Sequence, residues 1–295
     1  MAHKSGFVNI IGNPNVGKSS LMNAMVGEKL CIVTAKAQTT RHRIMGIVNG
    51  EDWQIVYSDT PGILKPVYRL QENMMRSVDA AIGDADVILY VTDTVEKPDK
   101  NTEYVEKLPS LACPVIIVIN KIDLSSQEKV RSLMAWWQEK VPAAHIIPAS
   151  AREHFNIDSI LAAVVERLPL SPPWYDKDTF TDRNLRFFAS EIIREKILEN
   201  YNDEIAYSCQ VEVESFREGE ERYDISAIIY VMRDSQKGIL IGAKGSMLKE
   251  IGKLARADIE MLLGGRCYLD LWVKVKKDWR DRDSVLKGFG FGNES

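Results

Sequence analysis

The chain has 295 residues, 45% of them hydrophobic and 27% charged, and its formal net charge is −4. This composition is typical of a globular protein with one large domain or two ordinary ones, and it excludes a disordered chain. The acidic balance argues against a protein that coats nucleic acid by bulk charge, although it is compatible with a local basic patch.

The four cysteines are far apart in the sequence and form no C-x-x-C pair, which argues against a zinc site and a disulfide framework. Free thiols fit a reducing cytosol. The first residues contain no apolar segment followed by a small-residue cleavage site, and no window approaches about 18 uninterrupted apolar residues. We therefore expect a protein that is neither secreted nor membrane-spanning.

The first predicted elements are a buried strand over residues 7–11 and a helix that begins at Lys18 and ends near Gly27. The segment between them, GNPNVGKS, matches the phosphate-binding pattern G-x-x-x-x-G-K-[ST]. In this pattern backbone N–H groups surround a phosphate, the lysine neutralises its outer oxygens, and the serine hydroxyl binds magnesium. The expected phosphate site comprises Gly12, Asn13, Pro14, Asn15, Val16, Gly17, Lys18, Ser19 and Ser20.

A second predicted strand, residues 53–57, leads into the sequence DTPG at residues 59–62. The carboxylate of this motif would lie at the carboxyl end of a strand, where magnesium lies in phosphate-loop proteins. The polar, basic segment before this strand contains Thr39 and Thr40, which are candidates to bind magnesium and sense the third phosphate. The pattern favours Thr40 without excluding Thr39, and a solvated basic loop is the alternative.

A further buried strand ends in the sequence NKID, residues 120–123. An aspartate there accepts two hydrogen bonds from the ring N–H and the exocyclic amine of guanine, a pair that adenine does not offer. Asn120 is expected to contact the base edge and Lys121 to pack over the ring, and a Ser-Ala pair after the strand predicted at 146–151 would close the base pocket. The expected GTP-binding residues outside the phosphate loop are Asp59, Thr60, Pro61, Gly62, Asn120, Lys121, Asp123, Ser150 and Ala151.

These four motifs, each at a boundary between a strand and a loop, predict a Ras-like GTP-binding domain with a mostly parallel sheet. The expected reaction is hydrolysis of GTP to GDP and phosphate. The expected catalytic residues are Lys18, Thr40, Asp59 and Gly62, and the expected Mg2+ ligands are Ser19, Thr40 and Asp59.

Two positions predict how hydrolysis differs from that of Ras. Ile63 stands where Ras has the glutamine that orients the attacking water, so we expect slow hydrolysis, with the water held by backbone groups, a cation or a partner. Asn15 matches the asparagine that coordinates potassium in a subset of related GTPases. K+ is therefore a second expected cation.

A proline-rich segment, with Pro169, Pro172 and Pro173 close together, follows the last predicted helix of this domain and marks a linker. The rest of the chain shows the periodicity of an amphipathic helix with Leu185 on its apolar face, a strand over residues 207–216 and a second strand over 223–233. Another amphipathic helix follows, and a final strand over 267–279 carries Lys274 and Lys276. We predict an α/β GTPase domain over residues 1–170, a linker over 171–178 and a smaller α+β domain over 179–295.

The sequence GAKG, residues 242–245, interrupts an apolar stretch just before a helix. In KH domains a G-x-x-G loop between helices binds the backbone of about four nucleotides. Residues 237–287 include twelve Lys or Arg and seven Asp or Glu, an excess of positive charge that the acidic overall balance conceals. This excess predicts a basic patch for RNA, and a solvated charged face is the alternative. The expected RNA-binding residues are Ile241, Gly242, Ala243, Lys244, Gly245, Lys249, Lys253, Lys274 and Lys276.

Nearly the whole chain resembles the Era family of bacterial ribosome-biogenesis GTPases. The resemblance rests on the motif series described above, on the order of elements around the G-x-x-G loop, and on the segments QTTRHRI, FFASEIIREKI and DLWVKVK. It implies a GTPase domain joined to a type II KH domain that binds the 3′ end of small-subunit ribosomal RNA and helps to mature that subunit. It also implies a cytoplasmic protein with loose peripheral attachment to the cell membrane, although no anchor or lipidation signal supports that attachment here. A monomer is expected.

Two other functions stay open at this point. The C-terminal domain could bind a protein or a non-ribosomal RNA, or the chain could be a nucleotide sensor without catalysis, since Ile63 replaces the glutamine. For the main hypothesis we expect GTP to order residues 38–43 and thereby to favour a domain arrangement in which the KH cleft is open to RNA.

Overall fold

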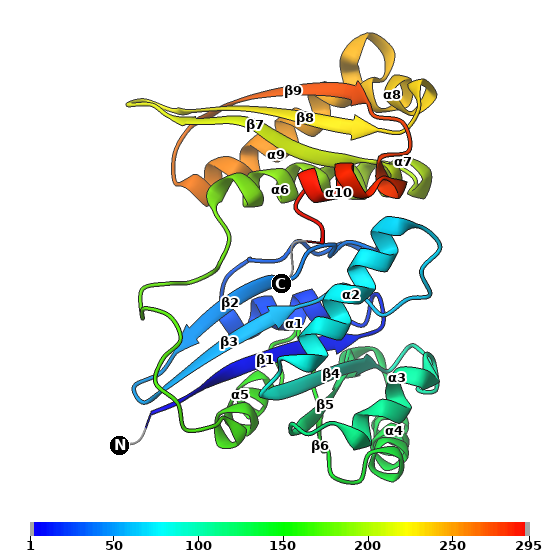
Figure 1. The fold of residues 1–295 in the computed structure, drawn as a ribbon, viewed down its shortest axis with the longest axis vertical. Helices are drawn as coiled ribbons and strands as arrows, with labels where there is room; N and C mark the ends of the chain where they lie inside the picture. Colours follow the sequence, from blue (N-terminus) through cyan, green and yellow to red (C-terminus); the bar gives the residue numbers. More distant parts are fainter. Residues whose placement is uncertain (1–2, 293–295) are drawn as a thin grey trace.

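The structure is a computed structural model that describes residues 3–292. Two layered units are stacked along the long axis of the molecule and are joined on one side by an extended segment (Figure 1). The N-terminal unit contains a six-stranded sheet of order β2-β3-β1-β4-β5-β6, and the C-terminal unit a three-stranded sheet of order β7-β8-β9. The predicted fold class is confirmed.

The N-terminal sheet is parallel except for β2, which pairs with β3 in the antiparallel sense. Its strands are β1 (Lys4–Gly12), β2 (Ile44–Asn49), β3 (Trp53–Asp59), β4 (Val87–Asp93), β5 (Val115–Asn120) and β6 (His145–Pro148). The helices of this unit are α1 (Lys18–Val26), α2 (Arg69–Gly83), α3 (Thr102–Lys107), α4 (Gln127–Lys140) and α5 (Ile157–Arg167), with short 3-10 turns η1 (Leu108–Ser110) and η2 (Ile122–Leu124).

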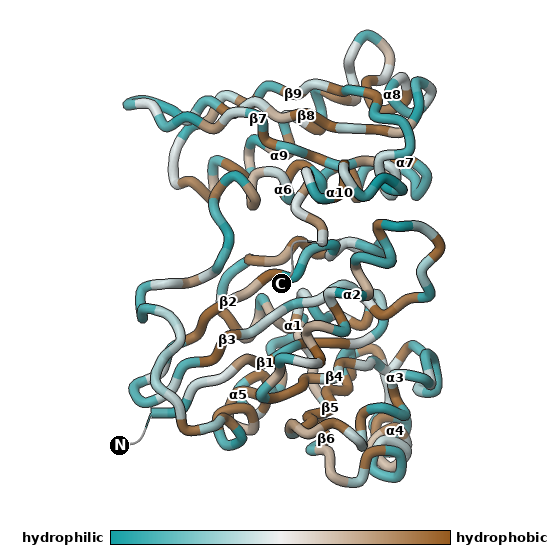
Figure 2. Tube along the Cα trace, viewed as in Figure 1, coloured by the Kyte–Doolittle hydropathy of each residue, from teal (hydrophilic) through white to brown (hydrophobic). Residues whose placement is uncertain are grey.

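Helices cover both faces of this sheet. The side chains of α1 and α5 join one core, and those of α2, α3 and α4 join the other. Strands β4 and β5 are buried along their whole length, so their sequences are continuous apolar runs, visible as hydrophobic stretches in Figure 2. Because β1, β3, β4 and β5 are parallel, their carboxyl ends meet at one edge of the sheet. The sequence motifs lie at this edge.

The C-terminal unit has its helices on one face of its sheet. Its elements are α6 (Leu185–Asn200), α7 (Asp203–Ser208), β7 (Gln210–Glu218), β8 (Tyr223–Val231), α8 (Asp234–Ile241), η3 (Ala243–Gly245), α9 (Ser246–Leu263), β9 (Cys267–Val275), η4 (Trp279–Asp281) and α10 (Asp283–Gly288). Strand β8 pairs antiparallel with β7 and parallel with β9. Apolar residues from α6, α9 and the covered sheet face form a third core.

Four sequence predictions differ from the structure in local detail. The strand predicted at residues 7–11 begins earlier, at Lys4, because its first residues pair with β3. Tyr207 and Ser208, predicted as strand, belong to α7 instead, and the strand predicted at 146–151 ends at Pro148. Leu185, assigned to the apolar face of the first helix of the second domain, is 44% exposed because it lies at the end of α6.

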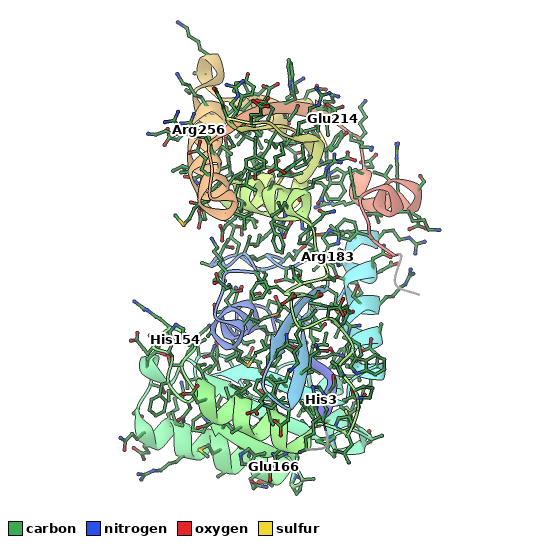
Figure 3. The ribbon with its side chains drawn as sticks, turned by 90° about the vertical axis from the view of Figure 1, so that its left-hand side faces the viewer. His3, His154, Glu166, Arg183, Glu214 and Arg256 are labelled. Carbon is green, nitrogen blue, oxygen red and sulfur yellow. The ribbon has the colours of Figure 1, made fainter. Side chains whose placement is uncertain are left out.

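The segment between α5 and α6 lies along the N-terminal sheet rather than hanging free. Gln54 of β3 accepts hydrogen bonds from the backbone N–H groups of Trp174 and Tyr175, at 2.7 and 3.0 Å. Thr181 bridges to Gly46 of β2. Figure 3 shows Arg183 at the level where the two units meet. The connection is therefore held along the edge of the first domain up to the start of α6.

Candidate nucleotide site and G-x-x-G loop

The phosphate loop connects β1 to α1 and borders a cavity of about 690 Å³. Gly17 has a φ of 93°, in the left-handed region that favours glycine. A Cβ at Gly17 would lie 2.3 Å from the Asn120 amide nitrogen, and one at Gly12 would lie 2.1 Å from the Val91 carbonyl oxygen. Both glycines are therefore required by the protein's own packing as well as by a ligand.

Lys18 is buried at the base of this loop. Its ammonium donates to the carbonyl oxygens of Gly12 and Asn13, at 3.1 and 2.9 Å. Since an ammonium has three donors, one is left for a phosphate oxygen. Burial lowers the pKa of Lys18 to about 8, although the negative charges of Asp59 and Glu96 raise it.

Three oxygen-bearing side chains from different elements converge beside Lys18. Ser19 Oγ donates to Asp59 Oδ2 at 2.6 Å and lies 2.9 Å from Thr40 Oγ1, which donates to the same carboxylate oxygen at 3.2 Å. The other oxygen, Asp59 Oδ1, is buried and has no hydrogen-bond partner within residues 3–292. Burial raises the pKa of Asp59, opposed by the Lys18 charge and by the two hydroxyl groups. Hard oxygen ligands with an unpaired buried carboxylate oxygen fit Mg2+.

The two candidate threonines point in different directions. Thr40 is buried and joins the Ser19 and Asp59 cluster, whereas Thr39 Oγ1 donates to the Lys36 carbonyl oxygen at 2.7 Å and bonds Thr34 Oγ1 at 2.7 Å. The geometry therefore supports Thr40 as the candidate metal ligand.

The DTPG motif follows β3 and packs against the phosphate loop. Thr60 Oγ1 donates to the Ile10 carbonyl oxygen at 2.7 Å. Gly62 lines the cavity, and a Cβ there would lie 2.8 Å from Pro14 Cα. The Ile63 side chain is buried in the core on the α2 side of the sheet. Gly62 is therefore placed to face a phosphate, while the Ile63 side chain is not.

The predicted base-binding residues come together at the ends of β5 and β6. Asn120 donates one amide hydrogen to the Val16 carbonyl oxygen at 2.9 Å and accepts from the Ala151 N–H at 3.0 Å, which leaves its second N–H for a base edge. Asp123 Oδ1 accepts from Ser150 Oγ at 2.6 Å, which orients the carboxylate. The NKID motif thus ties the phosphate loop to the residues that follow β6.

Lys121, expected to pack over the base, lines the cavity. Its ammonium forms an ion pair with Asp93 at 2.7 Å and also donates to the Asn15 carbonyl oxygen. The Asn15 amide donates to the Ala35 carbonyl oxygen at 3.2 Å. Asn15 therefore links the phosphate loop to the segment that carries Thr40.

Sequence reasoning missed two groups of residues around this site. Leu198 and Glu199 of α6 line the cavity although they belong to the second domain, and no local pattern signals a contact between units so far apart in the sequence. Asn101 and Glu96, behind the phosphate loop, make side-chain hydrogen bonds with Asn13. Their position after β4 was the one available clue, because this strand ends at the same edge of the sheet.

The G-x-x-G sequence forms a turn between α8 and α9, as its pattern predicts for a KH domain. Its lysine, Lys244, is exposed at the tip with a φ of 53°. Lys249, Lys253 and Lys274 are exposed as well. Lys276 differs from the expectation of a free basic residue on the strand: it follows β9, and its ammonium lies 4.8 and 4.6 Å from the centroids of Tyr230 and Phe289.

Comparison with known proteins identifies the family. The model of a family described as 50S ribosome-binding GTPase matches residues 7–121, and that of the KH domain matches residues 204–280. GTPase Era of Staphylococcus haemolyticus strain JCSC1435 is 44% identical over 291 residues, which cover 98% of this chain and 97% of that protein. The chain belongs to the Era family of GTPases. GTPase Era of Heliobacterium modesticaldum strain ATCC 51547 / Ice1 is also 44% identical, over 290 residues and with the same coverage.

Solved Era structures are similar over nearly the full length. A variant of Aquifex aeolicus Era bound to GDP.AlF4− has a TM-score of 0.93 and 39% identity, covering 97% of this chain and 99% of that one. Era in complex with MgGDPNP and nucleotides 1506–1542 of 16S ribosomal RNA has a TM-score of 0.93 and 38% identity, covering 98% and 99%. The Era-family resemblance and the expected GTPase activity are thus confirmed. Between residues 3 and 292, no helix is long and apolar enough to cross a membrane.

Proposed function

We propose that this chain is a GTP-switched RNA-binding protein that binds the 3′ end of small-subunit ribosomal RNA through its KH domain and assists assembly and maturation of that subunit. The observation that carries the proposal is the full-length similarity to Era in complex with MgGDPNP and nucleotides 1506–1542 of 16S ribosomal RNA, at a TM-score of 0.93. The exposed G-x-x-G turn and its neighbouring lysines give this chain the local features that RNA binding requires.

The nucleotide would lie in the cavity beside the phosphate loop. In this proposal the GTP-binding residues are those predicted from the four motifs, and Lys18, Thr40, Asp59 and Gly62 act in hydrolysis. Lys18 supplies its one remaining N–H donor to phosphate oxygens. Gly62 presents its backbone to the nucleotide, and its close packing on Pro14 restricts the movement of that backbone. Asp123, oriented by Ser150, reads guanine.

The oxygen cluster of Ser19, Thr40 and Asp59 fits Mg2+, and we assign these three side chains as its protein ligands. When bound, magnesium neutralises charge on the β- and γ-phosphates. The chain's own residues would hold the cation in position. Thr40 belongs to the segment of residues 28–43, which connects α1 to β2, and Ser19 belongs to the start of α1.

K+ is proposed as a second cation at Asn15. The Asn15 Nδ2 donates to the Ala35 carbonyl oxygen, a bond that does not use the amide oxygen of Asn15. A cation near this oxygen would contribute positive charge near the phosphates. Hydrolysis is expected to be faster in potassium chloride than in sodium chloride of the same ionic strength, and equal rates would rule the proposal out.

Residues 28–43 provide the physical connection between the nucleotide site and the KH domain. Arg41 is 1% exposed, and its guanidinium donates to the Cys209 carbonyl oxygen at 2.7 Å and to Gln210 Oε1 at 3.2 Å. It also lies 5.9 Å from the Trp279 ring centroid. Thr40 and Arg41 are adjacent, so a shift of Thr40 at the cation site would also move Arg41, which binds the KH domain.

Helix α6 makes the second set of contacts with the same segment. Arg194 donates to the Thr39 carbonyl oxygen. Glu195 accepts from Lys29 at 2.7 Å and from the Val33 N–H at 3.1 Å. We propose that GTP stabilises this arrangement of residues 28–43 and thereby the domain orientation that admits RNA.

The remaining assignments follow from this role. We propose domain limits of 1–170 and 179–295 with a linker over 171–178, and the end of α5 at Arg167 supports the first of these limits. A monomeric, cytoplasmic protein fits action on a ribosomal subunit, with peripheral membrane contact as a separate proposal. The alternative KH partner, a protein or a non-ribosomal RNA, is distinguished by the following experiment.

The test is binding of the full chain, loaded with a non-hydrolysable GTP analogue or with GDP, to a short RNA that carries the 3′ end of small-subunit ribosomal RNA, at several salt concentrations. We expect tighter binding in the analogue state. Lys244→Ala should weaken binding and reduce the slope of log affinity against log salt by about 1, because one phosphate contact is lost. Lys140→Ala, on α4 of the GTPase domain, is the matched control.

Two results would contradict the proposal. If neither nucleotide state prefers this RNA over an unrelated one, the ribosomal target is wrong. If Lys244→Ala binds as tightly as the parent protein, the G-x-x-G turn is not the RNA site, and a protein partner becomes the better hypothesis.

A further inference from the structure

The glutamine position of Ras-like GTPases is occupied by Ile63, whose side chain is 1% exposed and lies in the core. Its backbone is held at both ends: the N–H donates to the Gly12 carbonyl oxygen at 3.0 Å, and the carbonyl oxygen accepts from the Asn101 amide at 3.2 Å. The preceding Gly62 packs on Pro14 and lines the nucleotide cavity. The backbone of Gly62 and Ile63 is therefore fixed by specific contacts on both sides.

Asn101 belongs to a chain of side-chain hydrogen bonds behind the phosphate loop. Its amide also donates to Asn13 Oδ1 at 2.5 Å, and Asn13 in turn donates to Glu96 Oε2 at 2.9 Å. Thr92 Oγ1 donates to the other oxygen of Glu96 at 3.3 Å. Asn13 is 2% exposed and the Glu96 side chain 11% exposed, so the chain of bonds is shielded from water over much of its length.

The direction of these bonds follows from one acceptor. An ionised carboxylate can only accept, so Glu96 requires Asn13 to turn its NH2 group inward and its oxygen toward Asn101. That oxygen requires Asn101 to present its NH2 group, which therefore also points at the Ile63 carbonyl oxygen. Asn101 precedes α3 with a φ of 59° and makes no side-chain cap bond to that helix. The Asn101 side chain therefore binds Asn13 and Ile63 and does not cap α3.

We propose that Asn13, Glu96 and Asn101 are positioning residues for GTP hydrolysis, which hold the backbone at Gly62 and Ile63 beside the terminal phosphate in place of orientation by a glutamine side chain. This inference rests on the proposed nucleotide site. A preorganised backbone donor contributes to the rate only if it is in place before the reaction, and a displacement of about 1 Å costs on the order of 100-fold.

The test is single-turnover GTP hydrolysis by the full chain with magnesium, together with the affinity for a fluorescent GDP. Asn101→Gly removes the amide and keeps the left-handed backbone without strain. We expect its single-turnover hydrolysis rate to fall about tenfold or more, with GDP affinity within about twofold of the parent protein. Asn101→Asp, which has the same shape but cannot donate, should be as slow as Asn101→Gly.

The matched control is Asn156→Gly. Asn156 also has a positive φ, of 61°, also precedes a helix without capping it, and donates to the Pro148 carbonyl oxygen at 2.8 Å. It takes no part in the network behind the phosphate loop, so its rate at saturating GTP should equal that of the parent protein.

Three outcomes would overturn the inference. Asn101→Gly could hydrolyse GTP at the parent rate, Asn101→Asp could restore the rate, or the loss in rate could be matched by an equal loss of GDP affinity, which would indicate a structural role alone. A parent protein that binds neither GTP nor GDP would overturn the proposed nucleotide site itself, and this result is distinguishable because it appears before any variant is compared.

Discussion

Single side chains at the nucleotide site divide their hydrogen-bonding capacity between the protein and the expected ligand. Lys18 uses two of its three donors on the phosphate loop, and Asn120 uses one N–H and its oxygen on Val16 and Ala151. These bonds fix each group in direction before a ligand arrives, and the remaining donor is then already aimed. This arrangement has a cost, because burial destabilises the charged form of Lys18. The lowered pKa of Lys18 reflects that cost.

This cost predicts a pH dependence of stability. The folded state binds the Lys18 proton less tightly than the unfolded state, because the pKa falls from 10.5 to about 8. The unfolded state therefore binds more protons between these values, and the free energy of unfolding rises with pH in this window. Relative to Lys18→Met, the nucleotide-free parent protein should gain about 2 kcal/mol between pH 7 and pH 10.

Urea unfolding of both proteins at each pH checks this prediction. Lys253→Met, at an exposed position on α9, is the control and should show a constant difference from the parent protein across the range. Stability curves of the parent and of Lys18→Met that run parallel with pH would show that the burial of this ammonium carries no net cost.

At the scale of elements, three glycines of α8 and the G-x-x-G turn are in different situations. Gly242 has φ 72° and ψ 179°, a region that is essentially restricted to glycine, and a Cβ there would lie 2.6 Å from Met247 Cγ. Gly245 is left-handed with a φ of 78° and lies in open space. Gly238 is inside α8, with no atom of the described chain within 4 Å of an added Cβ. The turn thus depends on its first glycine most of all.

Alanine substitutions should therefore change stability with opposite signs within one short stretch. Gly242→Ala should lower the free energy of unfolding by about 3 kcal/mol or more, because strain and overlap add. Gly245→Ala should cost about 1 kcal/mol. Gly238→Ala should stabilise by about 0.5 to 1 kcal/mol, since alanine is the better helix former. Denaturant unfolding of the three variants gives the ranking, and a destabilised Gly238→Ala would contradict it.

At the scale of the whole molecule, the domains meet through buried polar groups as well as apolar ones. Burial lowers the pKa of Arg41 to about 10, and the nearby positive charge of Arg194 adds to this effect. His42 stacks on Phe291 of the C-terminal segment, with 4.1 Å between ring centroids. An arrangement of this kind has a specific geometry, because buried donors left unpaired in any other orientation would be costly.

Arg41→Ala is expected to uncouple the domains. It removes the hydrogen bonds to Cys209 and Gln210, so the residue next to Thr40 no longer binds the KH domain directly. The ratio of RNA affinities in the GTP-analogue and GDP states, which coupling of typical strength would set at about 5 to 150, should fall toward 1. RNA binding of both loaded forms, measured side by side, checks this.

A matched control is available within the KH domain. Arg186→Ala also removes an arginine that donates to backbone carbonyl oxygens, those of Val213 and Glu214, but these contacts stay inside one domain. It should keep the nucleotide dependence of RNA binding. If Arg41→Ala keeps it as well, the signal passes through another contact, and the pair of Arg194 with Thr39 would be the next candidate.

The sequence by itself determined the local features of this protein. The phosphate loop, DTPG, NKID and G-x-x-G are short segments whose backbone conformation depends on their own residues and flanking elements, so these motifs and the fold class could be predicted directly. The sequence favoured Thr40 without excluding Thr39, and the structure shows that the two adjacent side chains point in different directions.

Only the tertiary structure decided which distant groups meet. The contact of Arg41 with α7 and β7, the arrival of Leu198 at the nucleotide cavity and the bonds from Glu96 through Asn13 and Asn101 to Ile63 join residues that are far apart in the chain. No periodicity records such pairs, since each depends on the relative position of whole elements. That position is set by the burial of the three hydrophobic cores together, which is a property of the complete fold and not of any one segment.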